Sequence, residues 1–110
     1  MIRLVLYQNK KKEFIGVDTL GHAESVYSGY DLVCSAVSIL VLNTVNSIER
    51  LTNSQIREEI SSEDGYIRFR LLSNPSKDTE LLFKSMVLGL KDMEEDENYS
   101  KYIELNFEEV

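Results

Sequence analysis

Two residues that occur once each in the chain, His22 and Cys34, give the strongest indication of chemistry in this sequence. A loop between Gly21 and Gly29 could fold His22 back over Cys34, which lies near the expected start of an apolar helix. A thiol at a helix N-terminus is favoured as the thiolate, because the positive end of the backbone dipole and the free amide groups of the first turn lie beside it. The pair therefore predicts a cysteine nucleophile with a histidine base.

Two neighbours of Cys34 are predicted to support it. Asp31 is a good N-cap residue, which would make Cys34 the third residue of the helix. The carboxylate of Asp31 could instead orient the imidazole of His22, as the third member of a catalytic triad does, and the two roles are compatible. Ser38 lies one helical turn after Cys34 on the same face, where it could contact the sulfur or order a water.

The chemistry that such a site would perform is peptide hydrolysis. His22 would take the thiol proton and Cys34 would attack a carbonyl carbon. The free amides of the first helical turn, including that of Cys34, would stabilise the oxyanion. The alternative is that Cys34 is a small buried hydrophobic residue and His22 an ordinary surface residue.

Composition limits the other possibilities. The 110 residues predict a single domain, 1–110, with 43% hydrophobic and 28% charged residues. The net charge of −7 argues against direct nucleic-acid binding and suits a positively charged partner. One histidine and one cysteine are too few for a usual zinc site, so neither a metal nor another cofactor is expected. No signal peptide and no apolar run near the roughly 18 residues of a membrane span is apparent, which predicts a cytoplasmic protein that does not enter a membrane.

Alternating apolar residues predict strands at 2–7 and 14–20, joined by a polar turn that includes the solvated lysines 10–12. Two further strands, 56–60 and 66–72, flank an Asp64-Gly65 hairpin turn. Glu58 and Glu59 are placed to pair with Arg68 and Arg70 across it. A last strand is expected at 102–107, with Ile103, Leu105 and Phe107 pointing inward.

Helices are predicted at 31–51 and 78–93. The first is apolar on nearly every side of its middle turns, so it should be covered on more than one face, and a homodimer is expected. The element order is β-β-α-β-β-α-β. It predicts a two-layer α+β fold with a mixed or mostly antiparallel sheet of about five strands and two helices.

The residues around the predicted site resemble one protein family. The matching positions are Gly21-His22-Ala23, Gly29, Asp31, Val33-Cys34 and Ala36-Val37-Ser38. Together they are similar to the ribosomal-processing cysteine proteases called Prp, also described as YsxB-like proteins, and the resemblance extends over essentially the whole chain. Ser35 departs from the alanine that is common in that family.

The resemblance implies a cytoplasmic endopeptidase that removes the N-terminal extension of bacterial large-subunit ribosomal protein twenty-seven during ribosome assembly. It implies a catalytic dyad of His22 and Cys34, with Asp31 and Ser38 as supporting residues, a loop between Gly21 and Gly29 over the substrate groove, and a homodimer. The first alternative is a noncatalytic module that binds ribosomal proteins through the same groove. A thiol redox sensor is less favoured, because the chain has no second cysteine to resolve a sulfenic acid.

Overall fold

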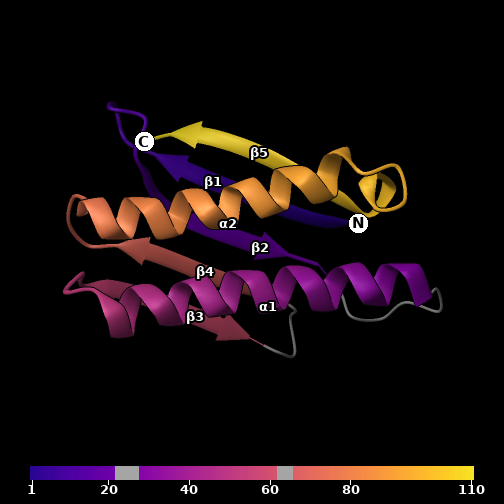
Figure 1. Cartoon of the computed structure of the whole chain (residues 1–110), viewed down its shortest axis with the longest axis horizontal. Coiled ribbons are helices and arrows are strands. Elements are labelled where there is room, and N and C mark those ends of the chain that lie inside the picture. Colours follow the sequence, from indigo (N-terminus) through magenta and orange to yellow (C-terminus); the bar gives the residue numbers. More distant parts are fainter. Residues whose placement is uncertain (22–27, 62–65) are drawn as a thin grey trace.

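Alternating apolar residues build a five-stranded sheet in the computed structural model, which describes residues 1–21, 28–61 and 66–110, with only the backbone described at 28–31. Two helices pack against one face of this sheet (Figure 1). The elements in chain order are β1 (Ile2–Gln8), β2 (Phe14–Leu20), α1 (Ser28–Leu51), β3 (Ile56–Ser61), β4 (Tyr66–Leu71), α2 (Lys77–Glu95), a 3-10 turn (Ser100–Tyr102) and β5 (Ile103–Glu109).

The strands lie in the order β3-β4-β2-β1-β5. β1 pairs with β2, β2 with β4 and β3 with β4 in antiparallel fashion, whereas β1 and β5 are parallel. The parallel pair arises because α2 carries the chain from β4 across the sheet to the far side of β1. The predicted α+β fold with a mixed sheet of five strands and two helices is therefore confirmed.

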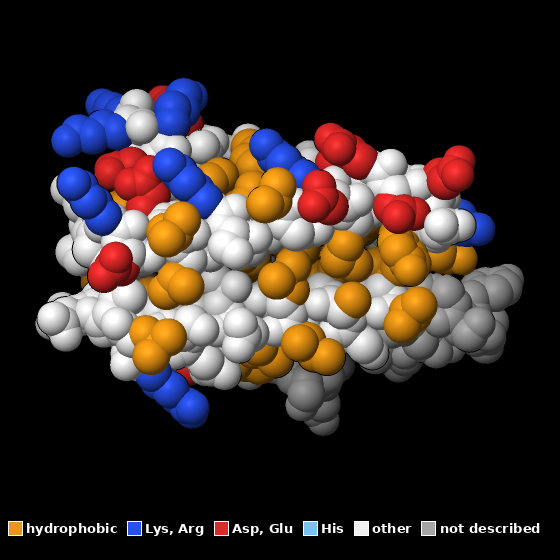
Figure 2. Space-filling model, in the orientation of Figure 1, with side chains coloured by type: hydrophobic (Ala, Val, Ile, Leu, Met, Phe, Trp, Pro, Cys, Tyr) orange, Lys and Arg blue, Asp and Glu red, His pale blue; other side chains and the backbone are white. Residues whose placement is uncertain are grey.

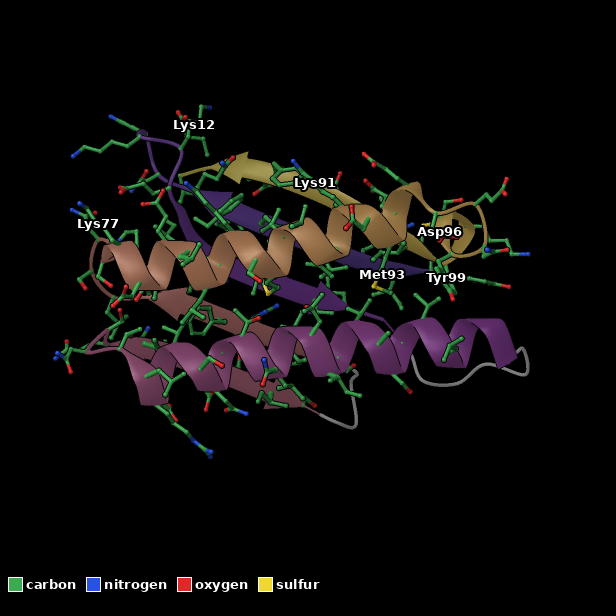
Figure 3. All side chains as sticks on the ribbon, in the orientation of Figure 1. Lys12, Lys77, Lys91, Met93, Asp96 and Tyr99 are labelled. Atoms are coloured by element: carbon green, nitrogen blue, oxygen red, sulfur yellow. The ribbon has the colours of Figure 1, made fainter. Side chains whose placement is uncertain are left out.

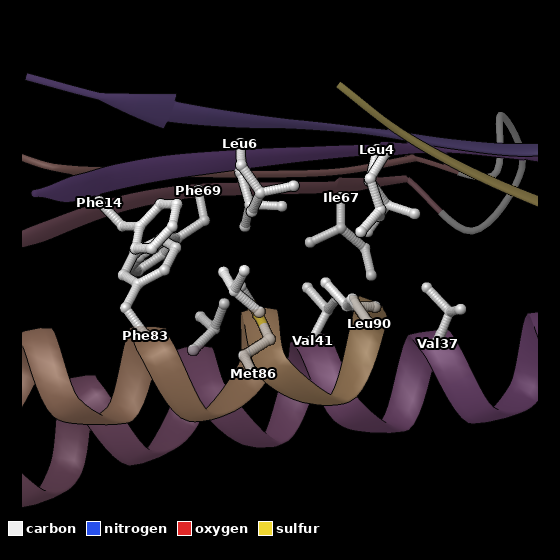
Figure 4. Packing of buried hydrophobic residues seen from close by; sticks show 14 of the residues in the cluster. Leu4, Leu6, Phe14, Val37, Val41, Ile67, Phe69, Phe83, Met86 and Leu90 are labelled. Carbon is white, nitrogen blue, oxygen red and sulfur yellow. The ribbon is translucent and has the colours of Figure 1, made fainter. Parts of the chain in front are cut away.

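The core lies between the helices and the sheet (Figure 4). Leu4 and Leu6 of β1 point toward the helices, and the rings of Phe14 and Phe83 stack with their centres 5.7 Å apart. Phe83 of α2 is fully buried. The other labelled core residues are Val37 and Val41 of α1, Ile67 and Phe69 of β4, and Met86 and Leu90 of α2.

The start of the first helix differs from the prediction. α1 begins at Ser28, so Asp31 is the fourth helical residue instead of the N-cap, and Gly29 lies in the first turn instead of the loop. Residues 28–30 contain no proline, and nothing else in them stops the helix from extending backward. An acidic residue is favourable throughout the first turn, so Asp31 indicated a nearby helix start without defining its first residue.

The last strand also begins and packs differently from the prediction. Tyr102 belongs to the 3-10 turn, and β5 runs to Glu109. Ile103 and Leu105 are buried as predicted, but Phe107 is 42% exposed, because it lies at the sheet edge beside Phe14 and under Lys91. The ammonium of Lys91, labelled in Figure 3, lies 5.1 Å from the centre of the Phe107 ring.

Both predicted hairpins are present, although the Asp64-Gly65 turn lies outside the described residues. The turn between β1 and β2 is organised by Asn9, whose side-chain oxygen accepts hydrogen bonds from the backbone N–H groups of Lys11 and Glu13. Lys12, at the same turn, forms an ion pair of 3.0 Å with Glu109. The lysines are thus part of a solvated turn.

One helix has the length and mean hydropathy of a membrane span, although it contains no uninterrupted apolar run of that length. Within the described residues, Leu32–Leu51 form a helical segment of 20 residues with a mean hydropathy of 1.5, long and apolar enough to cross a membrane by length and composition alone. Serine, threonine and asparagine residues interrupt its apolar run, but valine, leucine and isoleucine keep its mean hydropathy high. The buried side of this helical segment, with Val37, Val41 and Ile48, is part of the protein core.

Candidate active site

A pocket of about 240 Å³ lies between α1 and the end of the sheet where β2 finishes and β4 begins. Its walls are mostly apolar and include Ile2 of β1, Val37 and Leu42 of α1 and Ile67 of β4. Every described residue that lines this pocket is uncharged. A neutral group of a bound peptide could therefore enter it without leaving a charge unpaired.

Cys34 and Ser38 both line this pocket, because they lie one turn apart on the same face of α1. Each is half-buried, and Cys34 also packs against the core. The sulfur therefore lies at the wall of a pocket large enough for a substrate side chain. Cys34 and Ser38 therefore lie on one face of α1, as the helical spacing predicted.

Gly21 lines the same pocket and joins it to the loop that follows β2. A side chain at this position would be crowded, because a Cβ would lie 3.2 Å from Ile2 Cγ1 and 3.3 Å from Ile2 Cα. His22, which directly follows Gly21, lies outside the described residues, and so does its predicted approach to Cys34. The backbone that leads to His22 is nevertheless placed at the pocket that contains the thiol.

The earlier start of α1 changes the role expected of the helix amides. With Ser28 as the first helical residue, the helical N–H groups without intrahelical acceptors belong to residues 28–30. Cys34 is in the second turn, so the prediction that its own N–H is a free donor of the first turn is wrong. The side chain of Asp31 is not described, so whether it orients His22 stays a prediction.

Thr19 of β2 is a pocket residue that the sequence analysis did not identify. It is 6% exposed, and its Oγ1 atom has no hydrogen-bond partner among the described residues. The alternating pattern of β2 could have placed Thr19 on the same face as the buried Val17. Its position in the pocket, however, depends on how β2 is aligned with α1, which no local pattern encodes.

Metal binding finds no support within the described part of the chain. No group of three or more histidine, cysteine, aspartate or glutamate residues there is placed to hold an ion.

Comparisons with known proteins match this geometry over almost the whole chain. A family model described as cysteine protease Prp matches residues 1–104. The ribosomal processing cysteine protease Prp of Staphylococcus aureus is 28% identical over 109 residues, which cover 97% of this chain and 99% of that protein. The protein of the same name from Bacillus subtilis is 27% identical over 100 residues, covering 87% and 89% of the two chains.

Solved structures show the same similarity. The crystal structure of the S. aureus protease with a substrate peptide superposes with a TM-score of 0.89 at 25% identity, covering 97% of this chain and 99% of that one. The same protease with a covalently linked product peptide gives a TM-score of 0.84 at 26% identity, with the same coverage.

Proposed function

Since this chain belongs to the family of Prp cysteine proteases, we propose that it removes the N-terminal extension of large-subunit ribosomal protein twenty-seven during ribosome assembly. The observation that supports this site most directly is that Cys34, Ser38 and the residue before His22 line one pocket, whose described lining residues are all uncharged. The net charge of −7 suits a basic ribosomal substrate, since opposite charges raise the rate of encounter. Such processing takes place in the cytoplasm, which is part of the same proposal.

The proposed reaction proceeds through an acyl-enzyme. The imidazole of His22 accepts the proton of Cys34 Sγ, and the thiolate attacks the scissile carbonyl carbon. Collapse of the tetrahedral intermediate breaks the C–N bond, and the imidazolium gives its proton to the leaving amine. Water then hydrolyses the thioester with His22 again acting as base, so that the free thiol returns. The covalently linked product peptide of the S. aureus protease is consistent with such a route.

Ser38 and Asp31 are supporting residues in this proposal. Ser38 lies where its hydroxyl could order the hydrolytic water beside the sulfur. Asp31, in the first turn of α1, would orient the His22 imidazole if the loop brings the ring to the helix.

The first test is cleavage of a synthetic peptide that spans the extension and the first residues of the mature ribosomal protein. The wild-type chain should shorten it, whereas Cys34→Ala and His22→Ala should each lower kcat/KM by at least about a hundredfold. Ser35→Ala is the matched control, because Ser35 is exposed, adjoins Cys34 and does not line the pocket, so cleavage should be normal. Normal cleavage by Cys34→Ala would show that the nucleophile is assigned wrongly.

We also propose a homodimer formed through the helical layer. On its outer side, Ile39 of α1 is 69% exposed and Leu88 of α2 is 63% exposed. Figure 2 shows hydrophobic side chains gathered along the seam between the two helices. Exposed apolar side chains gathered on one face favour contact with a second copy.

A further inference from the structure

The hydroxyl of Thr19 is a buried polar group to which the described part of the chain offers no hydrogen-bond partner. Within the described residues, three polar side chains are buried, and all are threonines. Thr44 donates to the carbonyl of Leu40 at 2.8 Å, and the Thr79 hydroxyl lies 2.6 Å from that of Ser54. Thr19 Oγ1 is the exception, because it has no hydrogen-bond partner.

The position of Thr19 in the sheet explains why its hydroxyl is unpaired. β2 lies between β4 and β1, and Thr19 pairs with Leu4 on one side and Ile67 on the other. The backbone groups around it belong to these ladders, and a strand offers no carbonyl one turn back, as the helix offers to Thr44. Leaving a buried hydroxyl unpaired costs about 1–3 kcal/mol, whereas a valine would fill the same space without this cost.

The side chain of Thr19 is directed toward the pocket that contains Cys34. Residues paired directly across strands share one face of the sheet, and Figure 4 shows Leu4 and Ile67 pointing from the sheet toward the helices. Thr19, Ile67, Val37 and Cys34 all line the same pocket. Since the hydroxyl and the methyl group both branch from Cβ, one step between staggered rotamers moves the hydroxyl to the place of the methyl group and the methyl group to the place of the hydrogen.

We propose that Thr19 is a specificity-determining residue, whose hydroxyl forms a hydrogen bond with an uncharged polar side chain of the substrate that enters this pocket. The inference rests on the proposed role of the pocket as the substrate site beside the nucleophile. The apolar walls, including Ile2, Val37 and Ile67, contact the body of that side chain. The absence of charge among the described lining residues favours a neutral end group, such as an amide or a phenol.

The test uses a synthetic pool of random-sequence peptides, with cleavage products identified by mass spectrometry, so that it does not depend on the identity of the ribosomal substrate. Wild-type products should be enriched in an uncharged polar side chain at one position relative to the cut. Thr19→Val should lose this enrichment, and Thr19→Ser, which keeps the hydroxyl, should retain it. Thr44→Val is the matched control, since Thr44 is equally buried but does not line the pocket.

Kinetics on the best pool-derived peptide separate this role from a structural one. A hydrogen bond made equally in the ground state and the transition state affects KM, so Thr19→Val should raise KM by about tenfold and leave kcat within about twofold. The same variant should unfold at a higher temperature, because it removes an unpaired buried hydroxyl. An unchanged KM, or a pool preference that survives in Thr19→Val, would overturn the inference even if the ribosomal peptide is cleaved.

Discussion

Asp18 of β2 holds two side chains on the face of the sheet that lies away from the helices. Its carboxylate accepts hydrogen bonds from the Tyr7 hydroxyl at 2.8 Å and from Arg70 Nη1 at 2.8 Å and Nη2 at 3.1 Å. The guanidinium of Arg70 lies 4.0 Å from the centre of the Tyr7 ring. Burial alone raises the pKa of Asp18, but the hydrogen bonds from Arg70 and Tyr7, with the charge of Arg70, outweigh it and hold the pKa below its ordinary value of 3.8.

We expect Asp18→Asn to lower the free energy of unfolding by about 1–2 kcal/mol at pH 7, because Arg70 loses its charged partner. A carboxyl group whose pKa is lower in the folded state stabilises the fold above its unfolded pKa, and this stabilisation is lost as pH falls through the folded pKa. The difference between wild type and Asp18→Asn should therefore be full at pH 7 and pH 5 and should shrink below about pH 4. Urea unfolding at these pH values measures it.

The control is Glu59→Gln, which removes the pair between Glu59 and Arg68. That pair has an N–O distance of 3.7 Å, and both side chains are more than half exposed, so the unfolding free energy should change by less than about 0.5 kcal/mol. Equal effects of Glu59→Gln and Asp18→Asn would contradict the central role of Asp18.

The sequence predicted ion pairs for both Arg68 and Arg70 within one hairpin, but Arg70 pairs across the other side of β4, because β2 is the neighbour there.

At the scale of elements, the close approach of β2 and β4 depends on Gly16. A Cβ at this position would lie 2.7 Å from Arg70 Cδ and 2.9 Å from the carbonyl oxygen of Phe69, which belongs to the backbone and cannot move aside. We expect Gly16→Ala to lower the free energy of unfolding by about 1–3 kcal/mol, measured by chemical denaturation.

Gly89→Ala in α2 is the matched control. Its Cβ would meet the Cδ2 atom of Leu40 at 3.0 Å, and this atom is the end of a flexible side chain. Because alanine favours a helix over glycine by about 1 kcal/mol, the variant should be as stable as wild type or more stable. A greater loss of stability in Gly89→Ala than in Gly16→Ala would show that backbone crowding at Gly16 is not the controlling contact.

Local patterns predicted some element boundaries better than others, for a physical reason. Both bounds of β2 were predicted correctly at residues 14–20, and so was the end of α1 at Leu51. In these segments the alternating or helical apolar spacing extends up to the boundary. The start of α1 was placed three residues late, since Ser28, Gly29 and Tyr30 neither continue nor break the apolar pattern. This error matters for the site, because it moves Cys34 from the first turn to the second.

For the whole molecule, the element order was enough to predict a two-layer α+β fold, but not which residues the layers bring together. Cys34 and Ser38 lie one turn apart on one helix. Helical spacing alone therefore explains why both line the same side of the pocket. Thr19, Ile67 and Ile2 join them only because β1 and β4 begin, and β2 ends, at the same edge of the sheet under α1. Sequence patterns were therefore enough to predict Cys34 as the nucleophile, while the pocket that it lines required the assembled sheet.

The outer side of the helical layer should determine the oligomeric state of the molecule. Ile39→Glu and Leu88→Glu place a charge on exposed apolar positions of the two helices without entering the core, so each should weaken dimerisation by at least about tenfold while the fold is retained. Sedimentation velocity over a range of concentrations measures this change. Val110→Glu is the control, because Val110 is 64% exposed but follows β5, outside the helical layer, and its dimer should be unaffected. A wild-type chain that stays monomeric would exclude the dimer, and dimers that survive both helix substitutions would place the interface on another face.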